Sequence, residues 1–513
     1  MTNQKDSNTI EIILFTILIV AIVISTINLF YNRSLWGDEA MLALNISQKS
    51  FLELLKPLEM NQVAPVGFLM TEKLFIILFG VHDWALRIYP FLSFLFSLIL
   101  LFKINQKLFE SKIISLISCV FFITNLSIFY YSNEVKQYSS DVLVSLLLIY
   151  TYISNADLKS KKEILFTSLV GAAAIFFSNT SIIILVTIAA CVLNNFFKRT
   201  TSKNFNKFVP LLIWLFSFTF YFLFFIKDHP TKKFMVDYWS ARKAFPTENI
   251  FSPEFRLFVF RKIKMLFSSF SEFGNTWIFF FALFLLGLYF IYKKEKRLIF
   301  LIAPLFIHFI LSICKLYPFE TRMLLYAIPI ISTFISFGLF SIVNIISKRT
   351  NLKIGYIIPI LPFVLLISLS FTCPVKKEEI KPCLQFANQH ISNGEKLYVY
   401  YMANPAFQFY RNEYSTIGKS SSVVIGNWHI HGCGKSFLGL KLNNVQYIDN
   451  EELVRLKGRF WLLFTNVSES SYFKVNGFSE DQYIINSIIK RGGRILKNRL
   501  FIGSSCYQIE FNN

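Results

Sequence analysis

Charged side chains are scarce in this sequence. Only 16% of the 513 residues are Asp, Glu, Lys or Arg, whereas 54% are hydrophobic, and the mean hydropathy is +0.50. Ordinary soluble domains have a larger charged share, about 25%, and few apolar runs as long as those seen here. The shortage of charge excludes a soluble globular protein, and the apolar runs predict a polytopic membrane protein.

Signatures of metal binding and of hydrolytic chemistry are also missing. The sequence has six histidines and seven cysteines, but it has no CxxC pair and no Cys/His spacing typical of a metal site. The C-terminal part contains no nucleophile elbow, phosphate loop or cluster of histidines. We therefore expect no tightly bound structural metal.

Acidic residues are outnumbered by basic ones, 31 against 52, which gives a formal net charge of +21. Much of the positive charge falls in short clusters between apolar runs, where it indicates topology, because cytoplasmic loops are rich in Lys and Arg. A nucleic-acid site would instead form one continuous basic face. We expect membrane lipid, and no nucleic acid, as a partner.

Eleven apolar runs are predicted to cross the membrane, because each is close to the roughly 17 to 25 residues that a spanning helix needs. They lie near residues 10–30, 85–103, 113–131, 138–154, 163–178, 180–197, 208–226, 275–292, 298–315, 323–346 and 354–373. The first run lacks a small-x-small cleavage site and should remain as an anchor. With this count, the basic loops fall on one side, which is cytoplasmic.

The apolar run from Val66 to Gly80 is short and contains Glu72 and Lys73. Counting it as a span would place the later basic loops on alternating sides. We therefore predict a re-entrant or interfacial helix on the outer face, with a tilted span as the alternative.

The sequence changes character from about Pro374 onward. KLYVYY, SSVVIG and RFWLLF predict buried strands, and DQYIINSIIKRGGR predicts a helix that ends at its glycines. We expect a transmembrane domain at residues 1–373, with outer-face loops at 31–84 and 227–274, and an extracytoplasmic α/β domain at 374–513. The predicted fold class is thus a mostly α, polytopic membrane protein with a C-terminal α/β domain.

Four cysteines lie in or at the edge of this exported domain: Cys373, Cys383, Cys433 and Cys506. An even number in an oxidising compartment allows two disulfides, and four reduced, buried thiols are the alternative. Trp428, His429 and His431 in GNWHIHGCG are the only concentration of site-like residues there, and a plain loop explains them equally well. We expect the domain to bind or position an acceptor.

Polar residues gather on the predicted outer face. Asp38 and Glu39 are adjacent in LWGDEAMLAL, directly after the first span, where ionised groups are hard to explain structurally. The alternative is that this pair caps the N-terminus of a helix. Other outer loops add further residues, most of them polar or aromatic, namely Asn61, Gln62, Pro65, His82, Asp83, Arg87, Glu134, Lys136, Tyr138, Asp141, His229, Lys232, Lys233, Tyr317, Glu320 and Arg322.

This arrangement suits transfer from a lipid-phosphate donor. A carboxylate would deprotonate the acceptor hydroxyl as it attacks, while Lys or Arg would stabilise the departing phosphate. Asp38 suits the base. The cations that suit the phosphate are Lys136, Arg322 and the pair Lys232 and Lys233. A divalent cation at Asp38 and Glu39 stays open, because phosphate leaving groups often use one.

The chain resembles the membrane glycosyltransferases of the GT-C architecture, in the branch with protein O-mannosyltransferases and aminoarabinose transferases. The resemblance is carried by WGDEA, APVGFL with LFGVHDWALRIYPFL, YYSNEVKQYSSD and LYPFETRMLLYAIP, in this order over residues 30–345. One departure is that the chain has only Pro65 in VAPVG, where aminoarabinose transferases keep PPLYY-like prolines.

The resemblance implies a polyprenyl-phosphate-linked sugar as donor, used on the outer face of the bacterial inner membrane. Asp38 matches the catalytic acidic position and Glu39 its neighbour. The matching donor-phosphate or substrate-binding positions are Arg87, Glu134, Lys136, Tyr138 and Arg322. The acceptor, whether protein, lipid or glycan, stays undetermined. The alternatives are a lipid-sugar transporter or flippase, and an O-antigen polymerase or ligase.

Overall fold

The computed structural model describes residues 4–511 with gaps. The residues outside the description are 1–3, 156–157, 159, 199–204, 248, 272, 295, 351–353, 393, 415–416, 418–422, 427–456, 466, 468–478 and 512–513. The motif GNWHIHGCG, with Trp428, His429, His431 and Cys433, falls outside the described residues.

The apolar runs form helices, the conformation in which a chain satisfies its own backbone hydrogen bonds in lipid. They are α1 (Gln4–Phe30), α4 (Asp83–Phe109), α5 (Lys112–Ile123), α6 (Leu126–Tyr131), α7 (Tyr138–Ser154), α8 (Lys161–Phe177), α9 (Ser181–Lys198), α10 (Phe208–Tyr221), α13 (Trp277–Lys294), α14 (Ala303–Ile313), α15 (Ile328–Thr350) and α16 (Ile360–Thr372). Every predicted span coincides with one or two of these helices, so the mostly α, polytopic fold class is confirmed.

Five helical stretches within the described part of the chain are long and apolar enough to cross a membrane. They are Asp6–Phe30, Asp83–Phe109, Phe205–Ile226, Trp277–Lys294 and Thr321–Thr350. Several other predicted spans are shorter apolar helices of 10–17 residues. The number of eleven crossings therefore stays a prediction.

The predicted span at 113–131 is divided by a helix cap. The Asn125 side chain accepts hydrogen bonds from the amides of Ser127 and Ile128, at 3.1 and 3.2 Å. An asparagine in this role starts a new helix, so α5 ends before it and α6 begins after it. α6 leads directly into the loop at residues 132–137, which carries two of the predicted site residues.

Two glycines bring α13 and α15 together. A Cβ atom on Gly287 would lie 1.9 Å from the carbonyl oxygen of Phe334, and one on Gly338 would lie 2.2 Å from that of Leu283. Small residues allow such close backbone approach between membrane helices. The contact fixes α15, which directly follows the 3-10 helix η5 (Thr321–Ala327) that carries Arg322.

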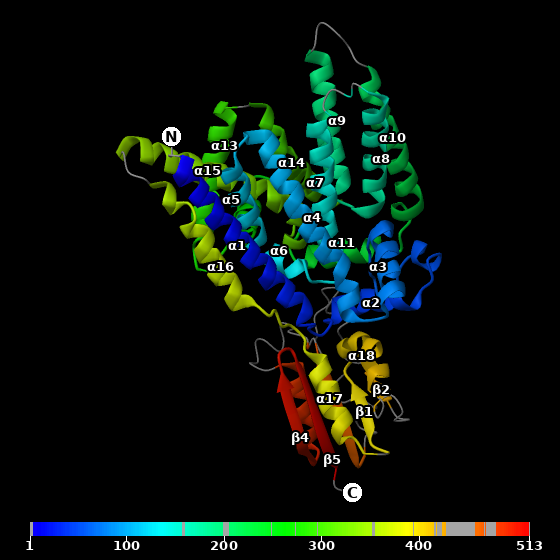
Figure 1. The fold of residues 1–513 in the computed structure, drawn as a ribbon. Helices are drawn as coiled ribbons and strands as arrows, with labels where there is room; N and C mark the ends of the chain where they lie inside the picture. Colours follow the sequence, from blue (N-terminus) through cyan, green and yellow to red (C-terminus); the bar gives the residue numbers. More distant parts are fainter. Residues whose placement is uncertain are drawn as a thin grey trace.

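Short helices cover the end of the bundle that faces the C-terminal sheet (Figure 1). They are α2 (Gly37–Gln48), α3 (Val66–Phe79) and α11 (Lys232–Ala241). The next helix in the chain after α11 is α12 (Pro253–Ser268). α3 has 14 residues and is not one of the helices long enough to cross a membrane. Because α5, α14 and α16 are no longer than α3, the length does not separate a re-entrant or interfacial helix from a tilted span, and the placement of α3 stays a prediction.

The C-terminal part forms a five-stranded sheet in the order β2-β1-β3-β5-β4. The strands are β1 (Lys396–Val399), β2 (Val423–Ile425), β3 (Arg459–Thr465), β4 (Gly493–Phe501) and β5 (Ser504–Phe511), with helices α17 (Ile380–His390), α18 (Asn404–Tyr410) and α23 (Glu480–Lys490). β1 is parallel to β2 and β3, whereas β3, β5 and β4 are antiparallel. The three predicted strands and the predicted helix are confirmed. The hairpin of β4 and β5 was not predicted, because most side chains of β4 are exposed and lack an alternating pattern.

The cysteines of this part are free where they are described. Cys373, Cys383 and Cys506 form no disulfide in the structure, and Cys383 and Cys506 are buried. The structure thus shows no disulfide among these three residues, and the alternative of four buried thiols fits only Cys383 and Cys506, because Cys373 is half-buried and Cys433 lies outside the described residues. The thiols of the three described residues lie against oxygen atoms of the chain, such as that of Ser504, 3.3 Å from the Cys383 sulfur.

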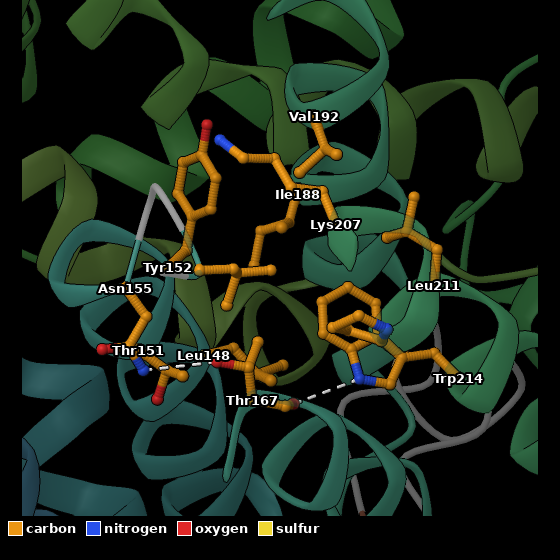
Figure 2. A pocket seen from close by; sticks show the side chains of 12 residues that line it. Leu148, Thr151, Tyr152, Asn155, Thr167, Ile188, Val192, Lys207, Leu211 and Trp214 are labelled. Carbon is orange, nitrogen blue, oxygen red and sulfur yellow. Dashed lines mark hydrogen bonds between the residues drawn. The ribbon is translucent and has the colours of Figure 1, made fainter. Parts of the chain in front are cut away.

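A small cleft of about 20 Å³ lies between α7, α8, α9 and α10 (Figure 2). Thr167 lies on its wall, where its hydroxyl accepts from the Asn155 amide and its carbonyl accepts from the Trp214 indole, both at 3.3 Å. Asn155 follows the C-terminal end of α7, whereas the predicted site residue Tyr138 begins that helix. The cleft is therefore separate from the predicted site.

Candidate active site

Asp38 lies in the first turn of α2 and meets cations from two distant loops. Its carboxylate is 3.2 Å from the ammonium of Lys136, in the loop between α6 and α7, and 3.0 Å from the guanidinium of Arg322 in η5. The Asp38 side chain is 25% exposed to solvent, whereas the Lys136 side chain is 7% exposed. The structure thus brings the predicted cations Lys136 and Arg322 to the partly exposed carboxylate of Asp38.

Gln62 completes this group, which we call the Asp38 cluster: Asp38, Gln62, Lys136 and Arg322. Its amide nitrogen donates to Asp38 at 3.3 Å, and its amide oxygen accepts from Lys136 at 2.7 Å. Burial alone would raise the pKa of Asp38, but Lys136 and Arg322 outweigh it and lower the pKa to about 2. Asp38 is therefore ionised at any physiological pH.

Two aromatic rings hold the Arg322 guanidinium. Its central carbon lies 4.6 Å from the ring centroid of Trp239, in α11, and 5.9 Å from that of Tyr138. Both distances are within the range of cation–π attraction. Trp239 was not predicted from the sequence, because its contact with Arg322 depends on how α11 folds over η5.

Glu39 faces away from the Asp38 cluster. Its fully buried carboxylate lies 3.0 Å from both Arg33 and Arg87 and accepts from the amide of Val135 at 2.9 Å. Burial would raise the pKa of Glu39, but the two arginines outweigh it and lower the pKa. Asp38 and Glu39 lie in the first turn of α2, as the alternative interpretation expects, but both carboxylates are also directed to cations of other elements.

Glu134 lies in a third, buried setting. One of its oxygens accepts from the indole of Trp36 and, at 3.3 Å, from the hydroxyl of Tyr130, while the other has no hydrogen-bond partner. Burial and the neighbouring charge of Glu39 raise the pKa of Glu134 to about 7. Glu134 thus borders Trp36, which directly precedes α2.

The remaining predicted residues lie apart from Asp38. Arg87 pairs with Glu39 inside the bundle. Lys232 and Lys233 are exposed at the start of α11, two turns before Trp239. Arg33 and Trp36 escaped the sequence analysis, although both stand in the YNRSLWGDEA segment that singled out Asp38 and Glu39.

The donor atoms around Asp38 do not fit a divalent cation. Both Asp38 oxygens face positive side chains, and the carboxylate of Glu39 is taken up by two arginines. Hard cations need several anionic or neutral oxygen ligands, and Lys136 and Arg322 would repel them. Among the described residues, no group of three or more His, Cys, Asp or Glu could hold a metal.

Comparisons with known proteins bear on the fold and the family resemblance of this chain. Residues 62–235 match the family model of dolichyl-phosphate-mannose-protein mannosyltransferases. The match includes Gln62, Lys136 and Tyr138, and it leaves out Asp38 and Arg322. A search of curated proteins gives no significant match.

Nearly the whole chain also shares its fold with a protein of known structure. The crystal structure of ArnT from Cupriavidus metallidurans bound to undecaprenyl phosphate has 11% sequence identity and a TM-score of 0.55, with 98% of each chain covered. Its apo structure has 11% identity and a TM-score of 0.52, with 96% of this chain and 97% of that chain covered. The resemblance expected from the sequence is confirmed at the level of the fold, which the chain shares with ArnT, and by the family-model match over residues 62–235.

Proposed function

We propose that this protein transfers a sugar from a polyprenyl-phosphate-linked donor to a nucleophile of an acceptor on the extracytoplasmic face of the bacterial inner membrane. The observation that carries the proposal is Asp38, a partly exposed carboxylate held between Lys136 and Arg322. A base beside two phosphate-binding cations is what this reaction requires. The fold shared with an ArnT structure that holds undecaprenyl phosphate supports the choice of donor.

The acceptor oxygen would attack the anomeric carbon of the sugar, and the bond between that carbon and the phosphate oxygen would break. The electron pair of this bond leaves with the polyprenyl phosphate, whose charge Lys136 and Arg322 would stabilise. Asp38 would take the proton of the acceptor hydroxyl. The products are then the glycosylated acceptor and polyprenyl phosphate.

Donor binding would also raise the basicity of Asp38. Its pKa of about 2 depends on the charges of Lys136 and Arg322. A donor phosphate that binds these two cations would compensate their charge and weaken their effect on Asp38. Asp38 would therefore become an effective base only when the donor is bound.

Glu39 and Arg87 would act by positioning. Every Glu39 oxygen is engaged by Arg33, Arg87 or the amide of Val135, and the side chain has no exposure. Glu39 thus links α2 to α4 and to the loop that carries Lys136. We assign contact with the substrate to Asp38, Lys136 and Arg322.

A transfer assay tests the proposal. The purified protein, in lipid nanodiscs, would receive undecaprenyl-phospho-[14C]sugars of different kinds, with membranes of the native host as the acceptor source. We expect label to leave the lipid donor and undecaprenyl phosphate to form. Asp38→Asn should abolish this release, whereas Glu59→Gln, a change at an exposed surface ion pair with Lys49, should not.

A binding assay separates the donor from other lipids. Undecaprenyl phosphate should bind the wild type and compete with the labelled donor, whereas undecaprenol, which lacks the phosphate, should not. Equal sugar release by wild type and Asp38→Asn would remove Asp38 as the base. Vectorial movement of the donor across a vesicle membrane without its consumption would instead support the transporter alternative.

A further inference from the structure

The segment between α16 and α17 passes directly beneath the start of α2. It is residues 373–379, the connection from the last apolar helix to the C-terminal sheet. The amide of Gly37, the first residue of α2, donates to the carboxylate of Glu378 at 2.9 Å. Glu378 is 7% exposed, so this bond is buried. The connecting segment therefore touches the helix turn that carries Asp38.

α2 lacks a cap of its own. Trp36 occupies the N-cap position and makes no side-chain hydrogen bond to the helix. A helix start leaves four amides without intrahelical partners, and serine, threonine, aspartate or asparagine usually accepts from one of them. Glu378 supplies the acceptor instead, from 341 residues away in the chain.

Neighbouring residues of the C-terminal part fix the rest of this turn. The Lys377 ammonium lies 3.0 Å from the ring centroid of Trp36. The amide of Leu35 donates to the Tyr410 hydroxyl at 2.8 Å, and the Ser34 hydroxyl accepts from the Lys381 amide at 3.1 Å. Residues 34–37 are thus held, one after another, by side chains or amides from residues 377–410.

We propose that Glu378 is a positioning residue that fixes the first turn of α2 and thereby places the Asp38 carboxylate between Lys136 and Arg322. The C-terminal part then supports the catalytic centre through its contacts with residues 34–37, in addition to any role in acceptor binding. The inference rests on the proposed function, because positioning matters only if Asp38 reacts. A displacement of about 1 Å of a reacting group can cost about a hundredfold in rate.

The chemistry of the bond identifies the matched variants. Glu378→Gln keeps a carbonyl oxygen at the same reach, so it can still accept from Gly37. Glu378→Asp keeps the charge but withdraws the oxygen by one methylene, and Glu378→Ala removes it. Burial raises the pKa of Glu378 to about 7, which agrees with a neutral side chain being tolerated there. The control is Lys376→Ala, because Lys376 is exposed and lies over Tyr31.

Steady-state transfer in nanodiscs gives the first readout. We expect Glu378→Ala and Glu378→Asp to lower kcat about ten- to a hundredfold, with the KM for the lipid donor within about twofold of wild type. Glu378→Gln should keep kcat within about threefold, and Lys376→Ala should match wild type. A wild-type kcat in Glu378→Asp, or an equal loss in Glu378→Gln and Glu378→Ala, would overturn the proposal.

Hydrogen exchange gives a readout that needs no activity. In Glu378→Ala and Glu378→Asp, the backbone amides of residues 37–41 should exchange about tenfold faster than in wild type, whereas Glu378→Gln should leave them protected. Unchanged exchange in all three variants would refute the positioning role even if the enzyme is active. If these amides exchange faster in Glu378→Ala than in wild type but the wild type transfers no sugar, the positioning role stands and the proposed function alone is refuted.

Discussion

The two faces of α2 carry adjacent carboxylates with opposite surroundings. Asp38 keeps a quarter of its exposure and meets a lysine and an arginine that a phosphate could share. Glu39 has no exposure and lies between two buried arginines. Successive helix residues point about 100° apart, so neighbours in sequence can face an open site and a closed core. Adjacency in a motif therefore does not imply a shared role.

The difference also shows how this site combines reactivity with rigidity. A fully buried charge pair is costly to break, whereas a partly open one can exchange partners with a ligand. The Glu39 side of α2 thus anchors the helix, and the Asp38 side remains free to react. Each prediction below changes one side of this comparison.

Removing the proposed base should have the largest effect. Asp38→Asn keeps the size of the side chain but cannot accept a proton, so sugar transfer should fall about 100- to 10,000-fold. The melting temperature should change little, because the site is partly open. Transfer from undecaprenyl-phospho-[14C]sugar and thermal unfolding in the same nanodiscs measure both. A large loss of stability with modest loss of activity would reverse the roles of the two carboxylates.

Removing the buried charge should act on stability instead. Glu39→Gln removes the carboxylate that pairs with Arg33 and Arg87, and breaking such a buried pair costs about 3 to 5 kcal/mol. Denaturation of the purified protein and its folded yield would show this loss. An Asp38→Asn variant serves as the comparison. Equal stability of the two variants would contradict the buried role of Glu39.

Changing the phosphate-binding cation should weaken donor binding by an intermediate amount. Arg322→Lys keeps the charge but loses the planar, multiply donating guanidinium, so the Kd for undecaprenyl phosphate should rise about tenfold. Arg322→Gln should weaken it further. Competition with the labelled donor measures both. Lys49→Gln, at the surface pair with Glu59, is the matched control. Unchanged affinity in Arg322→Gln would exclude this residue from the phosphate site.

The pH dependence of stability should separate the buried carboxyl of Glu134 from Asp38. The pKa of Glu134 is raised to about 7, so the folded protein binds a proton that the unfolded chain, with a pKa near 4.5, does not. Stability should therefore rise as the pH falls from about 8 to 5. Glu134→Gln should flatten this rise. The pKa of Asp38 is lowered to about 2, so its contribution is lost only below about pH 4. An unchanged slope in Glu134→Gln would contradict the raised pKa.

The smallest effect should come from the ring beside Arg322. Trp239→Leu removes a cation–π contact worth about 0.5 to 2 kcal/mol, so donor affinity should fall a few-fold. In Trp239→Phe the donor affinity should fall less, because an aromatic ring remains beside Arg322. The competition assay used for Arg322 measures both. A larger loss in Trp239→Phe than in Trp239→Leu would contradict the proposed stacking.

Much of the fold follows from local sequence. Apolar runs predicted the helices because a backbone in lipid has no water to bond with and must satisfy itself. The strands of the C-terminal sheet followed where apolar residues are buried, as in RFWLLF, and the exposed strand β4 escaped because it has no such pattern. The overall architecture was also accessible, through motifs whose order resembles a known family.

The sequence by itself determined that Asp38 lies beside the membrane helices near cations on other loops. Only the tertiary structure decided which cations: Arg322 reaches Asp38 from 284 residues away, and Arg87 turns to Glu39 instead. It also decided that Glu378 of the C-terminal part accepts a hydrogen bond from Gly37, the first residue of α2. Such pairings depend on how helices and loops pack across the whole chain, and local composition carries no information about contacts at this separation.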